Sequence, residues 1–174
     1  MNFETLLARD AALSNRLRVA EQPGPLRNIA ILFGHSGDSW FWLAGLLLTG
    51  WLGSPIWKTR AAILFVSILV TALLVLALKF AIRRRRPEGE WGQMYRKTDP
   101  HSFPSGHAAR GMMLGVVAFG LGPAWFGWLL LVWGPLVGPA RIAMGVHYVS
   151  DVLAGWIVGL GMGLAILGLV GQYL

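Results

Sequence analysis

The 174-residue sequence contains no cysteine and few acidic residues: 8 aspartates and glutamates stand against 15 lysines and arginines. The absence of cysteine excludes disulfide bonds, thiolate nucleophiles and thiolate metal sites. Charged residues make up only 13% of the chain and hydrophobic residues 55%, which excludes an ordinary soluble domain. The net charge of +7 does not indicate nucleic-acid binding, because most cations stand at the ends of apolar segments, where anionic lipid or an anionic substrate would meet them.

Long apolar segments predict an all-α fold, a polytopic bundle of membrane helices. Residues 61–78 and 152–170 approach or reach the roughly 18 to 20 apolar residues that cross a bilayer core as a helix. No linker is evident, so residues 1–174 are expected to form one membrane-embedded domain with its transmembrane bundle at 26–171. About five crossings are expected, at 26–52, 60–82, 104–122, 124–140 and 148–171. The polar sequence GHSGDS (34–39) breaks the first of them, and a sixth crossing results if 26–36 spans alone.

Residues 1–22 form a separate amphipathic segment. Apolar side chains gather on one side of a helix there, with arginines interleaved. This pattern predicts an interfacial helix that lies on the membrane surface and ends by Pro23 and Pro25.

The alternating chain direction brings three polar clusters to one membrane face. They are KFAIRRRRP (79–87), PSGHAAR (104–110) and ARIAMGVHYVSD (140–151). G-x-x-x-G spacings in the helices that carry the second and third clusters would allow close helix approach, at Gly111–Gly115, Gly134–Gly138 and Gly155–Gly159. The three clusters can therefore converge on one site.

The first cluster places Lys79 and Arg86 seven residues apart. If the helix continues to Pro87, the two cations project from one face about 10 Å apart along the axis. Lys79 lies within an apolar run, where an ionisable side chain requires a partner. The arginines at 83–85 are more simply interpreted as a basic membrane boundary whose side chains reach toward lipid head groups.

The second cluster begins a helix at Pro104, a residue suited to a first turn. Ser105, Gly106 and His107 then offer backbone N–H groups and a hydroxyl at a positive helix end, where a phosphate fits. The plainer alternative is an ordinary helix cap with an incidental histidine. Arg110, one turn further on, either assists the site or is an interfacial arginine.

The third cluster contains Arg141 and, at i and i+4, His147 and Asp151. The carboxylate can accept a hydrogen bond from one ring nitrogen and direct the other outward, as a nucleophilic or basic histidine requires. A purely structural pair is the plainer alternative. A metal site with His107, His147 and Asp151 as ligands is disfavoured, because there is no HExxH-like spacing and the cations of the clusters would repel a divalent ion.

Taken together, the clusters fit K-x(6)-R-P, P-S-G-H and R-x(5)-H-x(3)-D, in this order over residues 79–151. In this the chain resembles the type 2 phosphatidic acid phosphatase superfamily of lipid phosphate phosphatases and vanadium-dependent haloperoxidases. One position departs from the pattern. The third motif of the family usually opens with Ser-Arg, whereas Ala140 precedes Arg141 here and removes a hydroxyl from the phosphate pocket.

The resemblance implies a metal-independent phosphatase that needs no cofactor. His147 would attack phosphorus to form a phosphohistidine, with Asp151 stabilising the imidazolium. His107 would protonate the leaving group and then activate water. The groups expected to hold the phosphate oxygens are Lys79, Arg86, Ser105, the Gly106 amide and Arg141.

The resemblance also implies a membrane lipid phosphate as substrate. A polyprenyl phosphate or diphosphate, such as undecaprenyl diphosphate, is favoured over phosphatidate and phosphatidylglycerophosphate, because small bacterial family members often act on such carriers. A lipid phosphotransferase would use the same residues. A non-catalytic lipid-binding or scramblase-like bundle would not need both imidazoles, and a haloperoxidase is disfavoured because the family members with that activity are soluble.

The expected location is a cell membrane, as a multi-pass protein of a bacterial inner or plasma membrane. With five crossings, the opposite face carries only Lys58 and Arg60, which predicts a cytoplasmic site. The site face then carries nine cations outside the site: Arg9, Arg16, Arg18, Arg27, Arg83, Arg84, Arg85, Arg96 and Lys97. With six crossings the four N-terminal arginines change sides and the count becomes five against six, so the number of crossings decides the orientation.

Overall fold

The computed structural model describes residues 2–171, whereas Met1 and residues 172–174 lie outside the described part of the chain. The described residues form an all-helical fold, as the apolar segments predict. The helices are α1 (Phe3–Arg16), α2 (Pro25–Ser36), α3 (Ser39–Leu52), α4 (Pro55–Ile82), α5 (Glu90–Arg96), α6 (Gly106–Leu121), α7 (Ala124–Ala143) and α8 (Val149–Val170).

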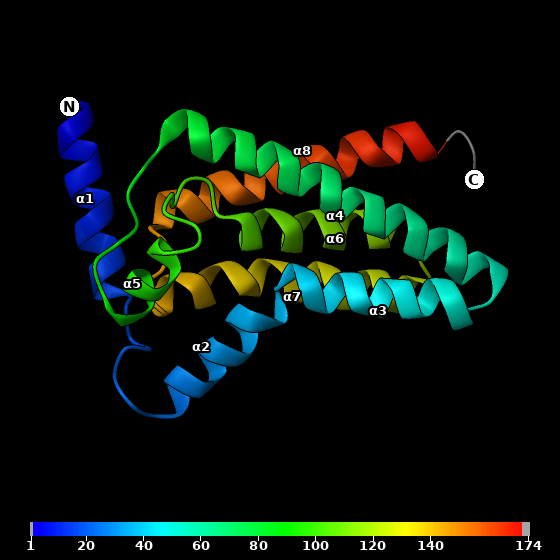
Figure 1. Ribbon diagram of the computed structural model, residues 1–174, viewed down its shortest axis with the longest axis horizontal. Coiled ribbons are helices and arrows are strands. Elements are labelled where there is room, and N and C mark those ends of the chain that lie inside the picture. Colours follow the sequence, from blue (N-terminus) through cyan, green and yellow to red (C-terminus); the bar gives the residue numbers. More distant parts are fainter. Residues whose placement is uncertain (1, 172–174) are drawn as a thin grey trace.

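Helices α3, α4, α6, α7 and α8 run alongside one another along the long axis, and α1, α2 and α5 lie at one end (Figure 1). Helix α6 is central and packs against α4, α7 and α8. Its Met113, Leu114 and Val117 are fully buried and form a core with Leu64 and Ile68 of α4. Because the long helices lie side by side, the end of α4, the starts of α6 and α8, and the end of α7 all lie close to α1, α2 and α5.

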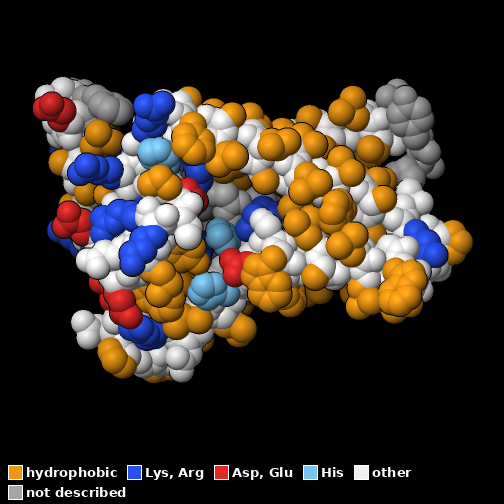
Figure 2. All heavy atoms as spheres, in the orientation of Figure 1, with side chains coloured by type: hydrophobic (Ala, Val, Ile, Leu, Met, Phe, Trp, Pro, Cys, Tyr) orange, Lys and Arg blue, Asp and Glu red, His pale blue; other side chains and the backbone are white. Residues whose placement is uncertain are grey.

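The surface of the long helices is apolar. Among the described residues, α4, α7 and α8 are long and apolar enough to cross a membrane, and α3 is a shorter apolar helix. Large hydrophobic side chains such as Trp51, Leu73 and Ile157 are mostly exposed. Figure 2 shows hydrophobic side chains over the long helices, while most charged and histidine side chains gather around α1, α2 and α5. Such a large exposed apolar surface is what a lipid bilayer covers, so the chain is a multi-pass membrane protein.

The break expected in residues 26–52 is confirmed, because α2 and α3 are separate helices that meet at Gly37 and Asp38. Helix α2 runs obliquely to the bundle, whereas α3 follows its long axis (Figure 1). The polar sequence is therefore a corner that places Asp38 at the start of α3, at the same end of the molecule as the three clusters.

The second crossing ends at residue 82, as expected, so the condition that the helix continue to Pro87 is not met. Helix α4 ends at Ile82, because Arg83 takes a left-handed conformation (φ 54°, ψ 34°), and its backbone N–H donates to the Lys79 carbonyl. The chain then turns, and Arg86 reaches the site from a loop. The N-terminal helix is shorter than expected, because α1 ends at Arg16 and does not continue to Pro23. The expected loop at 83–103 contains the short helix α5.

Glycines bring the motif-bearing helices into backbone contact, as their spacing predicts. A Cβ atom on Gly134 would lie 2.2 Å from the Gly111 carbonyl oxygen, and one on Gly159 would lie 2.1 Å from that of Ala109. Neither position can hold a side chain without separating the helices. The starts of α6 and α8 and the end of α7 are thereby held close together.

Candidate active site

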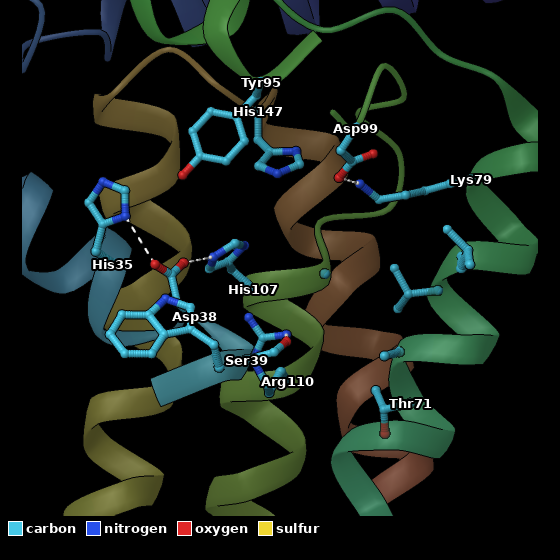
Figure 3. Close-up of a pocket in the computed structure, with 15 residues that line it drawn as sticks. His35, Asp38, Ser39, Thr71, Lys79, Tyr95, Asp99, His107, Arg110 and His147 are labelled. Atoms are coloured by element: carbon cyan, nitrogen blue, oxygen red, sulfur yellow. Dashed lines mark hydrogen bonds and ion pairs between the residues drawn. The ribbon is translucent and has the colours of Figure 1, made fainter. Parts of the chain in front are cut away.

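A cavity of about 550 Å³ lies among the ends of α3, α4 and α6 (Figure 3). Its wall includes five residues of the predicted clusters: Lys79, Gly106, His107, Arg110 and His147. One side of the wall is mostly apolar and comes from Trp40 of α3 and from Thr71, Ala72, Val75 and Leu76 of α4. The remaining lining residues are His35, Asp38, Ser39, Tyr95 and Asp99. Trp40 and Leu76 are 70% and 49% exposed, so the cavity continues to the apolar surface between α3 and α4.

His147 and Asp151 lie close together, but not on one helical face: His147 precedes α8 (Val149–Val170), and Asp151 lies in its first turn. Nδ1 of His147 lies 3.5 Å from Oδ2 of Asp151, an ion-pair distance slightly longer than a hydrogen bond. Both side chains are almost completely buried. The same Asp151 oxygen accepts a hydrogen bond of 2.9 Å from the backbone N–H of Tyr148. The opposite ring nitrogen of His147, Nε2, remains directed away from Asp151 and toward Arg86, 3.2 Å from Nη1.

The surroundings of His147 favour its uncharged form. Burial and the charges of Arg86 and Arg141 lower the pKa of His147 to about 3, although the Asp151 carboxylate acts in the opposite direction. At neutral pH the ring is therefore an imidazole whose Nε2 bears an electron pair, which accepts from Arg86 Nη1 in this structure. That is the form a nucleophilic histidine needs.

Arg84 is a functional neighbour that the sequence interpretation assigned wrongly. Instead of reaching toward lipid, its guanidinium donates to Oδ1 of Asp151 at 2.7 Å and to Ser150 Oγ at 2.6 Å. Its other terminal nitrogen donates to Asp10 of α1 at 2.6 Å. Arg84 therefore fixes the carboxylate that faces His147, and it ties the start of α8 to the N-terminal helix.

Arg141 is fully buried, and its charge is only partly compensated. Its Nη1 donates to the Tyr95 hydroxyl at 3.1 Å, and its guanidinium lies over the Tyr95 ring at 4.5 Å. Nε and Nη2 have no hydrogen-bond partner among the described residues. A buried guanidinium with unpaired N–H groups is costly unless an anion completes it.

The carboxylate of Asp99 pairs with the other two predicted cations, Lys79 and Arg86. Its Oδ2 accepts hydrogen bonds from Lys79 Nζ and from Arg86 Nη2, the latter at 2.7 Å, and its backbone carbonyl accepts from Arg86 Nε at 2.6 Å. Burial raises the pKa of Asp99, but the hydrogen bond and charge of Lys79 and the charge of Arg86 outweigh it and hold the pKa below its ordinary value. An ionised carboxylate therefore stands where the phosphate of a substrate is expected.

The start of α6 has the expected cap. Ser105 is fully buried, its Oγ accepts from the Ala108 N–H at 3.4 Å, and its own N–H donates to the Asp151 carbonyl at 2.9 Å. Gly106 lines the cavity directly. The N-terminus of α6 is thus positioned against the start of α8, with His107 projecting into the cavity (Figure 3).

His107 has an acidic partner of its own. Its Nε2 lies 2.7 Å from Oδ1 of Asp38, and the other oxygen of Asp38 lies 3.2 Å from His35 Nδ1. The interfacial interpretation of Arg110 is wrong, because this residue is only 7% exposed and bonds to the corner that carries Asp38. The plainer alternative for His107, an incidental histidine, does not account for this arrangement.

Sequence reasoning missed Asp38, Tyr95 and Asp99, all of which line the cavity. A polar sequence interrupting an apolar segment was the available signal for Asp38. No local pattern marks Tyr95 or Asp99. Within residues 2–171, no group of three His, Cys, Asp or Glu side chains could hold a metal ion, so the alternative with His107, His147 and Asp151 as ligands gains no geometric support.

Comparison with known proteins places this geometry in context. The family model of the PAP2 superfamily matches residues 60–173. An undecaprenyl-diphosphatase of Sulfolobus acidocaldarius is 30% identical over 99 residues, which cover 55% of this chain and 48% of that protein. The chain thus spans about half the length of this curated relative.

Two solved structures share the fold. A transmembrane PAP2 type phosphatidylglycerolphosphate phosphatase of Bacillus subtilis superposes with a TM-score of 0.75 at 24% identity, over 97% of this chain and 87% of the other. LpxE of Aquifex aeolicus superposes with a TM-score of 0.69 at 23% identity, over 90% of this chain and 93% of the other. Both superpositions cover more of this chain than residues 60–173, so they extend into the part that precedes residue 60.

Proposed function

Because this chain belongs to the PAP2 superfamily, we propose that it is a metal-independent phosphatase that hydrolyses a membrane lipid phosphate through a phosphohistidine. One observation carries the proposal. A single cavity joins two imidazoles and the cation Lys79 to an apolar wall that continues to the exposed surface between α3 and α4. A phosphate head group fits the polar end, and its lipid chain fits the apolar wall.

In the first step, Nε2 of His147 attacks phosphorus and forms a P–N bond as the P–O bond to the lipid breaks. The neutral ring supplies the electron pair, and Asp151 stabilises the positive charge that develops on it. His107 donates a proton to the departing oxygen, so the lipid leaves as an alcohol, or as a lipid monophosphate if the substrate is a diphosphate.

In the second step, water attacks the phosphohistidine. His107, now neutral, takes the proton from the water while the P–N bond breaks, which releases inorganic phosphate and restores both histidines. The equatorial oxygens are held throughout by Lys79, Arg86, Arg141, the Ser105 hydroxyl and the Gly106 amide. For Arg141, a bound phosphate would supply the partner that Nε and Nη2 lack among the described residues.

The substrate class we favour is a polyprenyl phosphate or diphosphate. The similarity to an undecaprenyl-diphosphatase supports this choice, and the long apolar wall of Thr71, Val75 and Leu76 suits an isoprenoid chain. Phosphatidate and phosphatidylglycerophosphate are the alternatives, as is transfer of the phosphoryl group to an alcohol other than water.

The test is phosphate release in detergent from prenyl phosphate, prenyl diphosphate, phosphatidate and phosphatidylglycerophosphate, with EDTA present. We expect release that vanishes in His147→Ala and is fastest with a prenyl substrate. Substantial release by His147→Ala removes this residue from the nucleophile role. If folded protein releases nothing from any of the four lipids, hydrolysis is excluded for them, and acceptor alcohols test the transferase alternative.

A further inference from the structure

The corner between α2 and α3 lies outside residues 60–173 matched by the family model, and its Asp38 forms a second histidine–carboxylate pair with His107 of α6. Asp38 Oδ1 lies 2.7 Å from His107 Nε2, and Asp38 Oδ2 lies 3.2 Å from His35 Nδ1 (Figure 3). His107 and His35 are 69 and 3 positions from Asp38, so the pair with His107 depends on how the corner between α2 and α3 is held against the start of α6.

The corner is held rigidly by side chains from three helices. Arg110 of α6 donates to the Gly37 carbonyl through Nε, at 2.8 Å, and through Nη2, and it donates to Ser39 Oγ through Nη1. The indole N–H groups of Trp42 and Trp133 donate to the carbonyl and hydroxyl oxygens of Ser36, each at 2.9 Å. The residues on both sides of Asp38 are thereby fixed, and Asp38 with them.

The packing also sets the orientation of the His107 ring. A Cβ on Gly37 would lie 3.3 Å from Cδ2 of His107, so this edge of the ring faces the corner. Nε2 faces Asp38. The opposite edge, with Nδ1, therefore faces the cavity in which the substrate oxygen would lie (Figure 3).

The charges around His107 make an anionic partner necessary for a general acid. Arg110 and Arg141 repel a proton on this ring, whereas Asp38 attracts one. A neutral histidine among these cations could not protonate a leaving group.

We propose that Asp38 is a positioning residue for His107: it orients the ring through Nε2 and stabilises the imidazolium whose Nδ1–H protonates the leaving oxygen. His35 supports Asp38 from the other oxygen. The proposal rests on the proposed phosphatase function and adds a residue to it. Asp38 then does for the general acid what Asp151 does for the nucleophile.

The dependence on the leaving group tests this role. kcat/KM reports the steps up to departure of the leaving group, so a defect in the general acid appears there and depends on how much the leaving oxygen needs a proton. We would compare an alkyl phosphate, whose alkoxide needs a proton, with p-nitrophenyl phosphate, whose phenolate leaves without one. For Asp38→Asn we expect kcat/KM to fall about 100-fold on the alkyl ester and less than about 3-fold on the aryl ester.

A double-mutant cycle tests whether Asp38 acts through His107. His107→Ala should show the same selectivity between the two esters, and Asp38→Asn should add little to it, since residues that act as a unit are non-additive. Asp38→Glu keeps the charge and should recover part of the loss on the alkyl ester. It also provides a second folded variant if Asp38→Asn is unstable in detergent.

Three results would overturn the proposal. Equal losses on both esters would indicate a structural role for Asp38, unchanged kcat/KM on both would indicate no role, and additive losses with His107→Ala would separate the two residues. If the wild-type protein turns over neither ester and cannot be distinguished from His147→Ala, the phosphatase function itself is overturned. The proposed role of Asp38 is then overturned as well.

Discussion

Replacing Asp99 by asparagine should make this protein bind phosphate more tightly. The Asp99 carboxylate accepts hydrogen bonds from both Lys79 and Arg86. A substrate phosphate that uses the same two cations must displace it. An asparagine side chain at this position would keep an oxygen acceptor and nearly the same shape but lose the negative charge, so the cations would stay in place with a weaker competitor.

The size of the effect follows from exposure. Because the Asp99 side chain is 41% exposed, each of its two ion pairs is screened by solvent, and each is worth at most about 1 kcal/mol. Removing both as competitors lowers the cost of phosphate binding by about 1 to 2 kcal/mol, and each 1.4 kcal/mol is about tenfold in affinity. We therefore expect Asp99→Asn to lower the inhibition constant of inorganic phosphate about tenfold, with a smaller effect at high salt.

The assay is inhibition of p-nitrophenyl phosphate hydrolysis by inorganic phosphate and by vanadate, at low and high ionic strength. Glu90→Gln is a matched control, since Glu90 pairs with Arg27 and does not line the cavity. An unchanged or weaker affinity for both anions in Asp99→Asn would refute the argument. It would mean that Asp99 assists phosphate binding by holding Lys79 and Arg86, instead of competing with it.

The contacts of His147 and Asp151 lead to two further predictions, and the proposed metal-independent mechanism leads to a third. Because its pKa is lowered to about 3, His147 gains a proton only near that pH. For p-nitrophenyl phosphate, whose leaving group needs no proton from His107, kcat/KM corrected for the second ionisation of the substrate should therefore stay flat from pH 7 down to about pH 4, and a fall below pH 6.5 would contradict this. Arg84→Gln should lower kcat about tenfold with little change in KM, because it removes the donor that holds the Asp151 carboxylate beside His147. Arg85 is exposed, so Arg85→Gln should match the wild type. Equal effects of the two variants would show that Arg84 does not have this role. Phosphatase activity should be the same before and after dialysis against EDTA. A loss of activity that an added divalent ion restores would instead indicate a metal-dependent mechanism.

What the sequence could predict depended on the range of the interactions. His147 and Asp151 come together because they are four residues apart at the start of α8, although His147 precedes the helix. The close approach of α6 to α7 follows from Gly111 and Gly134. Asp99 escaped prediction because nothing nearby in the sequence relates it to Lys79, 20 residues away across a loop. The end of the second crossing at residue 82 was predicted, but the turn that follows it was not, because a left-handed arginine carries no sequence signal of the kind that glycine gives.

Asp38 illustrates the same limit at a longer range. An acidic residue in a polar break of an apolar segment predicts a functional position in general terms. Its partner His107 is 69 residues away, and the contact exists only because Arg110 and two tryptophans fix the corner between α2 and α3. Interactions assembled by packing of distant helices are not encoded in any local pattern.

The two histidines must hold opposite proton states in one cavity, and the proposed roles agree with the difference between their surroundings. His147 is almost completely buried, and its Nε2 faces Arg86 at 3.2 Å, while the charge of Asp151 is shared with Arg84. Burial and the nearby cations therefore exclude a proton and leave the ring nucleophilic. At His107 the carboxylate of Asp38 is shared with a second histidine, His35, while Arg110 directs its N–H groups to Gly37 and Ser39. A bound phosphate adds further negative charge beside Arg141, which reduces the repulsion on a proton at His107. Substrate binding would thus complete the acid at His107, while Arg86 and the in-line phosphorus keep the proton from the attacking nitrogen of His147.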